Sequence, residues 1–360
     1  MIYLISVAMV VAYLGFAPPK YGIQAYNYKK YIMICSVLIA VVAAIRSPYA
    51  GSGDTLTYVR RYEAIQTYES FAEFYEKDRS DYSFLLSEAG FYYVMWLLGK
   101  VFQSGQTAVI VSSIMVTLAT CWFIRKNSVD VPLSLTIYVC LGLFTFNMNG
   151  MRQAMAMSVC LFAYEYVKKQ KFIPFILTVL LAMQFHRTAM CFLPMFFLPK
   201  LKNNARSWLF YIAGLATCLI FVDQIIAGYY QIGGKDYSTS EAANRGGLFV
   251  ILLYLGAIVL TLYNSHILQK QEIRVMMLAT LAGFTAYIAR FFGIDILERV
   301  SYYYFYFPLL LIPEAFRELE FNEYKVIKVI FVTGCLLLFV YRIWKGQFDY
   351  FAFFWSRPFF

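Results

Sequence analysis

Charged residues are scarce in this sequence. Only 14% of its 360 residues are Asp, Glu, Lys or Arg, whereas 61% are hydrophobic. Soluble domains carry roughly 25% charged residues, so the composition excludes an ordinary soluble enzyme and favours a polytopic membrane protein. The apolar runs along the chain predict an all-α integral membrane protein that forms one domain over residues 1–360.

Histidine and patterned cysteine are also nearly absent. The chain has two histidines, His186 and His266, and its seven cysteines stand singly inside apolar runs without any C-x-x-C spacing. Isolated cysteines in apolar runs are typical of packing residues. We therefore expect no disulfide framework, no metal site and no cofactor.

The first sixteen residues, MIYLISVAMVVAYLGF, lack a basic n-region and a small-residue cleavage site. They are interpreted as a retained first span rather than a secretory signal. The net charge of +10 falls in short clusters between apolar runs, which indicates membrane orientation and not a nucleic-acid partner.

Twelve apolar runs approach the roughly 20 residues that cross a bilayer. They lie at about 1–16, 31–46, 106–124, 131–147, 151–167, 171–186, 188–201, 207–226, 247–263, 275–290, 300–316 and 326–343. Short basic connections such as RKNS, KKQK and QKQEIR occur at every second gap, which the positive-inside rule assigns to the cytoplasm. Both termini are then expected outside.

One apolar segment does not fit this alternation. GFYYVMWLLGKVFQ, residues 90–103, is too short for a full span and is interpreted as a re-entrant or interfacial helix. A long external loop over 47–89 precedes it, and a second external loop is predicted over 227–246. No internal repeat divides the chain.

Arginine and lysine separate across this predicted topology. Twelve of the sixteen lysines fall on the cytoplasmic side, whereas eleven of the fifteen arginines fall outside. The planar fork of arginine matches phosphate and carboxylate bidentately, so the outer face is predicted to bind anions. Chance, together with the tendency of arginine to snorkel at interfaces, is the alternative explanation.

Two antiparallel helices are predicted to form one external pocket. The helix from Arg152 to Lys168 measures about 24 Å at 1.5 Å per residue, and after the KKQK turn the next helix returns to His186 and Arg187. The residues predicted to share one external pocket are Arg152, Gln153, Gln184, His186 and Arg187. A lone histidine at a helix end is often a cap; here it could also accept a proton from a sugar hydroxyl or donate to a phosphate.

Two further segments carry polar residues on the predicted outer face. RSPYAGSGDTLTYVRRY begins at Arg46 and places Asp54 and Tyr58 after two glycines; either Asp54 is a helix N-cap or it orients a histidine or binds sugar hydroxyls. ARFFGIDILERVSYYYFYF carries Arg290 and Arg299, and its aromatic run from Tyr302 is either an interfacial belt or the wall of a groove for sugar rings or an isoprenoid chain.

The acidic residues within the apolar segments fall near span ends, as Glu165, Asp223 and Glu314 illustrate. Charges near the bilayer centre would be typical of an ion-coupled transporter. Their positions at the ends favour chemistry at the membrane boundary instead.

The segment NMNGMRQAMAMSVCLFAYEYVKKQKFIPFILTVLLAMQFHRTAM resembles the EpsG family of Wzy-type polysaccharide polymerases. The family shows an asparagine-containing turn before RQ, a span, a basic turn and a span ending in FH. Its upstream arginine, aspartate and tyrosine are met by Arg46, Asp54 and Tyr58, and its late arginine followed by aromatic residues is met by Arg299. Arginine at position 187, after the histidine, departs from the small or polar residue expected there.

The resemblance implies a polytopic, GT-C-like glycosyltransferase in a bacterial inner membrane with its active site facing the periplasm or exterior. A growing glycan would pass from undecaprenyl diphosphate to the non-reducing end of another lipid-linked repeat unit, without a metal. A chain-length regulator of the Wzz type is a possible partner, besides membrane lipids.

Fixed arginines can stabilise the charge that develops on a diphosphate leaving group. Arg152, with Arg299 and Arg290, is the predicted diphosphate clamp, and His186 or Asp54 is the predicted general base. Further substrate contacts are expected from Gln153, Arg46, Tyr58, Arg187 and Tyr302. A ligase that uses another acceptor, a lipid-oligosaccharide flippase and, less well matched, a membrane acyltransferase are the alternatives.

Overall fold

The computed structural model of the protein describes residues 2–13, 29–48, 54–79, 88–231, 247–292, 295–345 and 353. These residues form helices and no β-strand; one isolated bridge joins Arg46 to Phe353. The helices are α1 (Ile2–Tyr13), α2 (Lys29–Ala44), α3 (Asp54–Ile65), α4 (Phe71–Arg79), α5 (Ala89–Gly99), α6 (Gln106–Asn127), α7 (Val131–Cys140), α8 (Leu143–Asn149), α9 (Met151–Lys168), α10 (Phe172–Met183), η2 (Arg187–Lys200), α11 (Ala205–Ile220), α12 (Val222–Gln231), α13 (Leu248–Tyr263), η4 (Ser265–Gln269), α14 (Gln271–Ala289), η5 (Arg290–Phe292), α15 (Asp295–Tyr304), α16 (Tyr306–Arg317) and α17 (Phe321–Trp344).

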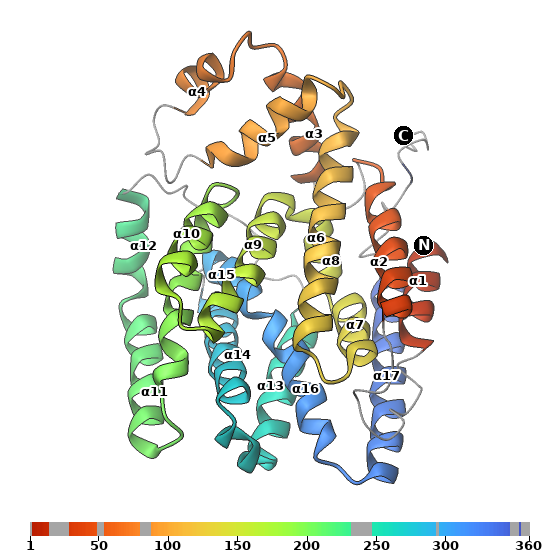
Figure 1. Ribbon diagram of the computed structural model, residues 1–360, viewed down its shortest axis with the longest axis vertical. Coiled ribbons are helices and arrows are strands. Elements are labelled where there is room, and N and C mark those ends of the chain that lie inside the picture. The colour runs from red at the N-terminus through yellow and green to blue at the C-terminus, as the bar shows by residue number, and fades with distance from the viewer. Residues whose placement is uncertain are drawn as a thin grey trace.

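Most helices run along one direction as a bundle, and α3, α4 and α5 lie across one end of it (Figure 1). We call this end the cap end and the opposite one the far end. The amide of Phe91 in α5 donates to Gln184 O at 3.0 Å. A Cβ on the neighbouring Gly90 would lie 2.6 Å from the Gln184 Cβ, so only glycine allows α5 to approach the end of α10 this closely.

By length and composition, three helices in the described part of the chain could each cross a membrane: Gln106–Asn127, Gln271–Ala289 and Asn322–Trp344. The pair α7 and α8, bent by 54°, is a fourth candidate if counted as one broken span. Four other apolar helices are shorter: Ala89–Gly99, Phe172–Met183, Ala205–Ile220 and Leu248–Tyr263. The fold is therefore that of a helical membrane protein, while the predicted count of twelve spans is not confirmed.

The two predicted external loops contain helix. Residues 47–89 include all of α3 and α4, and the predicted loop over 227–246 begins inside α12, which continues to Gln231. Residues 232–246 lie outside the described part. At 90–103 the structure has the eleven-residue helix α5, about 16 Å long, which is too short for a full crossing.

The segment predicted as a span over 188–201 is a 3-10 helix, η2, with Pro194 and Pro199 inside it. Proline removes the i to i−4 hydrogen bond of an α-helix. A 3-10 helix rises about 2.0 Å per residue instead of 1.5 Å, so the fourteen residues of η2 reach about 28 Å. The tighter winding lets a short segment extend over most of the roughly 30 Å hydrocarbon thickness.

The apolar run predicted as one span over 131–147 is broken between α7 and α8. Gly142 has φ +112°, a backbone conformation that favours glycine. Arg342 of α17 donates to Cys140 O at 3.1 Å and to Thr145 Oγ1 at 3.2 Å. Its guanidinium group thus satisfies a carbonyl at the end of α7 that the break would leave without its helical partner.

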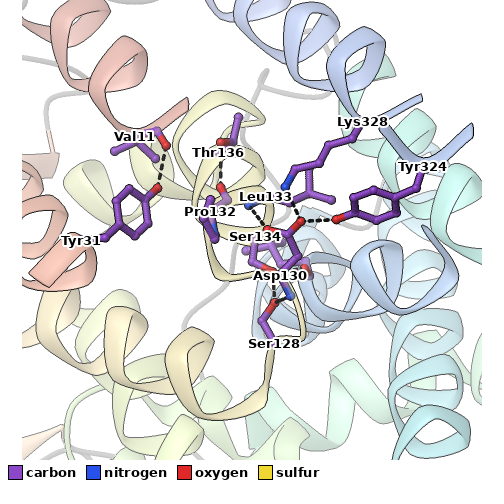
Figure 2. Close-up of polar contacts among 11 residues, drawn as sticks. Val11, Tyr31, Ser128, Asp130, Pro132, Leu133, Ser134, Thr136, Tyr324 and Lys328 are labelled. Atoms are coloured by element: carbon purple, nitrogen blue, oxygen red, sulfur yellow. Dashed lines mark hydrogen bonds and ion pairs between the residues drawn. The ribbon is translucent and has the colours of Figure 1, made fainter. Parts of the chain in front are cut away.

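A buried ion pair joins α7 to α17 at the far end (Figure 2). Asp130 caps α7 by accepting from the Leu133 amide at 3.1 Å. Its other carboxylate oxygen accepts from Lys328 Nζ at 2.5 Å and from the Tyr324 hydroxyl. Asp130 and Lys328 side chains are each 3% exposed, so each charge depends on the other for solvation.

Replacement of Lys328 by Met is expected to destabilise the folded protein by roughly 3–5 kcal/mol, because the Asp130 carboxylate would remain buried without a counter-charge. The double variant Asp130→Asn, Lys328→Met should lose less, since no buried charge remains. Thermal unfolding of the purified protein in detergent measures both. A double variant no more stable than Lys328→Met would contradict the ion pair as the cause.

Candidate functional site

Two arginines share one buried carboxylate at the cap end. Glu88, which directly precedes α5, accepts from Arg152 Nη1 through Oε2 and from the Arg187 amide at 3.2 Å through Oε1. The Arg187 Nε lies 3.6 Å from the same Oε1. We call Glu88, Arg152 and Arg187 the arginine–glutamate cluster; with two cations and one anion, its formal charge is +1.

Burial sets the electrostatics of this cluster. The side chains of Glu88 and Arg187 are 2% and 1% exposed, whereas Arg152 is 14% exposed. Burial alone would raise the pKa of the Glu88 carboxyl, but the guanidinium groups of Arg152 and Arg187 outweigh it and hold the pKa at about 2. Glu88 is therefore ionised at neutral pH, and Arg152 is the member most accessible to a ligand.

Aromatic rings surround Arg152, which lies in the first turn of α9. Its guanidinium carbon lies 5.4 Å from the ring centre of Tyr58 and 5.9 Å from those of Phe91 and Tyr92. Nη1 also donates to the Tyr92 hydroxyl at 3.3 Å, while Nε has no hydrogen-bond partner among the described residues. All three rings lie within cation–π distance of the guanidinium group.

His186 lies beside this cluster, at the junction of α10 and η2, and is 2% exposed. Its Nδ1 lies 2.6 Å from Thr188 Oγ1, which in turn lies 3.1 Å from the Tyr303 hydroxyl of α15. The Thr188 amide donates to Nδ1 at 3.4 Å. Nδ1 is thus engaged, and the histidine's other ring nitrogen, Nε2, is the one left for a substrate.

The helix α15 closes the site from a third side. Gln153 Nε2 donates to the Arg299 carbonyl at 2.5 Å, which ties the first turn of α9 to α15. Arg299 and Tyr303 are four residues apart and so share one face of α15. The structure therefore brings together Arg152, Gln153, His186 and Arg187 as the helix pairing predicted, with Tyr58 and α15 beside them.

Arg46 does not join this group. Its guanidinium group donates to Ala43 O, to Ser113 Oγ at 2.8 Å and to Met148 O at 2.5 Å, and the side chain is 1% exposed. It ties the end of α2 to α6 and α8. These contacts engage Nη1 and Nη2 of Arg46, and its predicted substrate contact stays a prediction.

Asp54 begins α3 and is solvent-exposed. The glycines that precede it, Gly51 and Gly53, lie outside the described residues, so the predicted glycine turn is not described. No hydrogen bond between Asp54 and His186 is recorded, and its role stays a prediction.

Arg290 and Tyr302 belong to a second group on the neighbouring face of α15. Arg290 Nη1 lies 2.7 Å from Glu298 Oε1 and donates to the Tyr287 hydroxyl at 2.9 Å. The Tyr302 hydroxyl donates to Glu298 Oε1 at 3.1 Å, and its ring stacks on Phe146 with centres 3.7 Å apart. The structure thus separates Arg290 and Tyr302 from the arginine–glutamate cluster.

Sequence reasoning missed Glu88. It lies 64 residues before Arg152 and 99 before Arg187, in a polar segment that carries several other acidic residues. Its position directly before the apolar segment of α5 was the available signal, because a carboxylate next to a buried apolar segment is buried with it. Among the described residues, no group of three or more His, Cys, Asp or Glu side chains is arranged to hold a metal ion.

Replacement of Glu88 by Gln is expected to destabilise the protein by roughly 3–5 kcal/mol at neutral pH, because two guanidinium groups lose their shared carboxylate. The pKa of Glu88 in the folded protein, about 2, lies below its usual 4.5. The stabilisation is therefore complete above about pH 4.5 and is lost as the pH falls towards 2. Thermal unfolding in detergent should show the difference between wild type and variant shrinking over that range.

Glu73→Gln is the matched control, because Glu73 pairs with Lys77 on the exposed surface of α4 at 2.7 Å. Exposed pairs contribute little to stability because solvent screens them. A Glu88→Gln effect as small as that of the control, or one independent of pH, would contradict the central role of Glu88.

Comparison with known protein families matches residues 29–355 to the EpsG family. No curated protein and no solved structure matches the chain. The matched range covers most of the chain and includes all three members of the arginine–glutamate cluster together with His186. The chain therefore belongs to the EpsG family, a family of Wzy-type polysaccharide polymerases.

Proposed function

We propose that the protein lengthens a polysaccharide by transferring a growing glycan from undecaprenyl diphosphate to the non-reducing end of another lipid-linked repeat unit. The reaction would take place at the outer face of a bacterial inner membrane, with the cap end facing the periplasm or exterior. The observation that carries the proposal is the buried arginine–glutamate cluster beside His186. A chain-length regulator of the Wzz type remains a candidate partner.

The cluster suits a diphosphate leaving group. Cleavage of a glycosyl diphosphate bond develops negative charge on the departing oxygen, and fixed donors in a poorly hydrated site stabilise such charge most strongly. Arg152 is the most exposed member of the cluster, and its guanidinium group contacts Glu88 and lies near three aromatic rings. We assign Arg152 to the diphosphate, with Arg187 and Arg299 adding positive charge and Gln153 positioning α15.

The acceptor hydroxyl requires a general base, and we assign His186 Nε2 to this role. This role requires the tautomer in which Nδ1–H donates to Thr188 Oγ1, 2.6 Å away, and the Thr188 hydroxyl then donates to Tyr303. In that tautomer the longer contact between the Thr188 amide and Nδ1, at 3.4 Å, is not a hydrogen bond. That arrangement leaves Nε2 as the acceptor nitrogen. Thr188 is then a positioning residue, and Asp54 is the alternative base.

Purified protein supplied with one defined lipid-linked repeat unit tests the proposal. A polymerase converts it into a ladder of products that differ by one repeat. A single product on a second lipid would identify a ligase instead, and translocation across vesicles without any new glycosidic bond would identify a flippase.

Arg152→Ala and Arg152→Lys are both expected to reduce ladder formation at least about 10²-fold, the loss typical of removing one donor to a developing charge. Lysine keeps the charge but cannot reproduce the planar fork that Glu88 and the rings orient. Arg206→Lys is the control, since Arg206 lies exposed in the first turn of α11. Full activity of Arg152→Lys would show that a point charge suffices.

His186→Gln is expected to reduce turnover about 10²–10⁴-fold, the usual contribution of a general base, with little change in substrate affinity. Asp54→Asn should keep near-normal turnover. The rates of ladder formation by the two variants, measured at saturating substrate, decide between the candidates. Near-normal turnover of His186→Gln together with loss of activity in Asp54→Asn would transfer the role to Asp54.

A further inference from the structure

A cavity of about 290 Å³ lies at the cap end on the other face of α15. Its walls come from the α7–α8 break, the start of α13, the end of α14, α15 and the end of α17. The lining residues that matter here are polar or aromatic: Thr145, Phe146, Tyr287, Glu298, Tyr302 and Arg342. Its volume is near the lower end of the roughly 300–1,000 Å³ typical of small-molecule sites.

The charged residues that line the cavity are Arg342 and Glu298. Arg342 forms one wall and donates to Cys140 O and Thr145 Oγ1. Glu298 forms another wall and pairs at 2.7 Å with Arg290, which lies outside the lining. Because Arg290 compensates the charge of Glu298, the three residues together carry a formal charge of +1, which favours an anionic group over a neutral one.

An apolar groove of about 190 Å³ adjoins this cavity. Leu141 and Phe249 line both spaces. The groove follows α13 from Phe249 to Leu260, about 16 Å at 1.5 Å per residue. Both α13 and α17 pack against α16, which lies between them (Figure 1), so α16 forms its floor. We call this space the α13–α17 groove.

Two glycines keep the groove open. A Cβ built on Gly256 of α13 or on Gly334 of α17 would meet no atom within 4 Å, although both residues line the groove. Its rim is exposed and apolar: Leu252 is 53% exposed and the neighbouring Leu337 is 65% exposed. A hydrocarbon chain could therefore enter sideways from the lipid phase.

We propose that the cavity and the α13–α17 groove together bind a second polyprenyl diphosphate-linked glycan. The polyprenyl chain lies in the groove, and its diphosphate lies at Arg342 with the first sugar against Tyr302 and Phe146. The proposal rests on the proposed function, because a polymerase that joins two lipid-linked glycans needs two such sites. A polar, positively charged cavity that continues into an apolar groove fits an amphiphile of this kind.

The test uses the full-length protein in detergent and a photoreactive polyprenyl diphosphate that carries no glycan. Labelled peptides are expected to come from α13 and α17. A Cβ at either glycine meets no atom within 4 Å, so Gly256→Leu and Gly334→Leu should each occupy part of the groove. Each should reduce this labelling about tenfold, the loss expected when roughly two chain methylenes are displaced. Arg342→Gln should reduce it as well.

Gly214→Leu is the matched control, because a Cβ on Gly214 of α11 also meets no atom within 4 Å and α11 has no buried residue. It should label as wild type does. Unchanged labelling in both groove variants would overturn the proposal. Suppression of the labelling by phosphatidylglycerol to the same extent as by unlabelled polyprenyl diphosphate would also overturn the proposal, since the groove would then hold ordinary membrane lipid.

Labelling requires no turnover, which separates this proposal from the proposed function. The protein could show groove labelling that depends on Gly256 and Gly334 and yet form no product ladder. That result would contradict the polymerase assignment and support the lipid site. A protein that forms the ladder but shows no groove labelling would support the polymerase assignment and contradict the lipid site.

Discussion

The cap end depends on the carboxylate of Glu88. Arg152 and Arg187 come from different parts of the helical bundle, and both charges are largely removed from water. An isolated buried ion would be strongly unfavourable, so the two guanidinium groups can lie this close only because one anion lies between them. The same carboxylate connects α5 to α9 and to the start of η2, so the position of the cap and the electrostatics of the site have one cause.

Sharing one carboxylate also suits turnover. Two unpaired arginines would bind the diphosphate of the donor and that of the released lipid about equally well, and uniform binding of this kind does not accelerate a reaction. Glu88 leaves a formal charge of +1, which in the proposed reaction would attract the diphosphate without neutralising it fully. The aromatic rings around Arg152 add orientation, which favours the geometry in which charge develops on the leaving oxygen.

Local features of the sequence predict part of this arrangement. A basic four-residue turn between two helices is enough to bring Arg152 beside His186 and Arg187, since antiparallel neighbours of similar length end at the same level. Glu88 was not predictable in that way, because its contacts span 64 and 99 residues. The break at Gly142 was hidden inside an apolar run, and its stabilisation comes from Arg342, 202 residues after Cys140. The segment 188–201 was predicted as an ordinary span, and its winding as a 3-10 helix over Arg187–Lys200, with two internal prolines, was not predicted.

The short helix α15 relates the two cap-end sites through helical periodicity. Arg299 and Tyr303 occupy one face, where the Arg299 carbonyl accepts from Gln153 and Tyr303 contacts Thr188. Glu298 and Tyr302 occupy the adjacent face, about 100° around the axis, and line the cavity. Glycosyl transfer requires the acceptor hydroxyl oxygen to come within bonding reach of the donor's anomeric carbon. Two lipid-linked glycans held on adjacent faces of one helix would have their head groups separated by little more than that helix, and a shift of α15 would alter both sites at once.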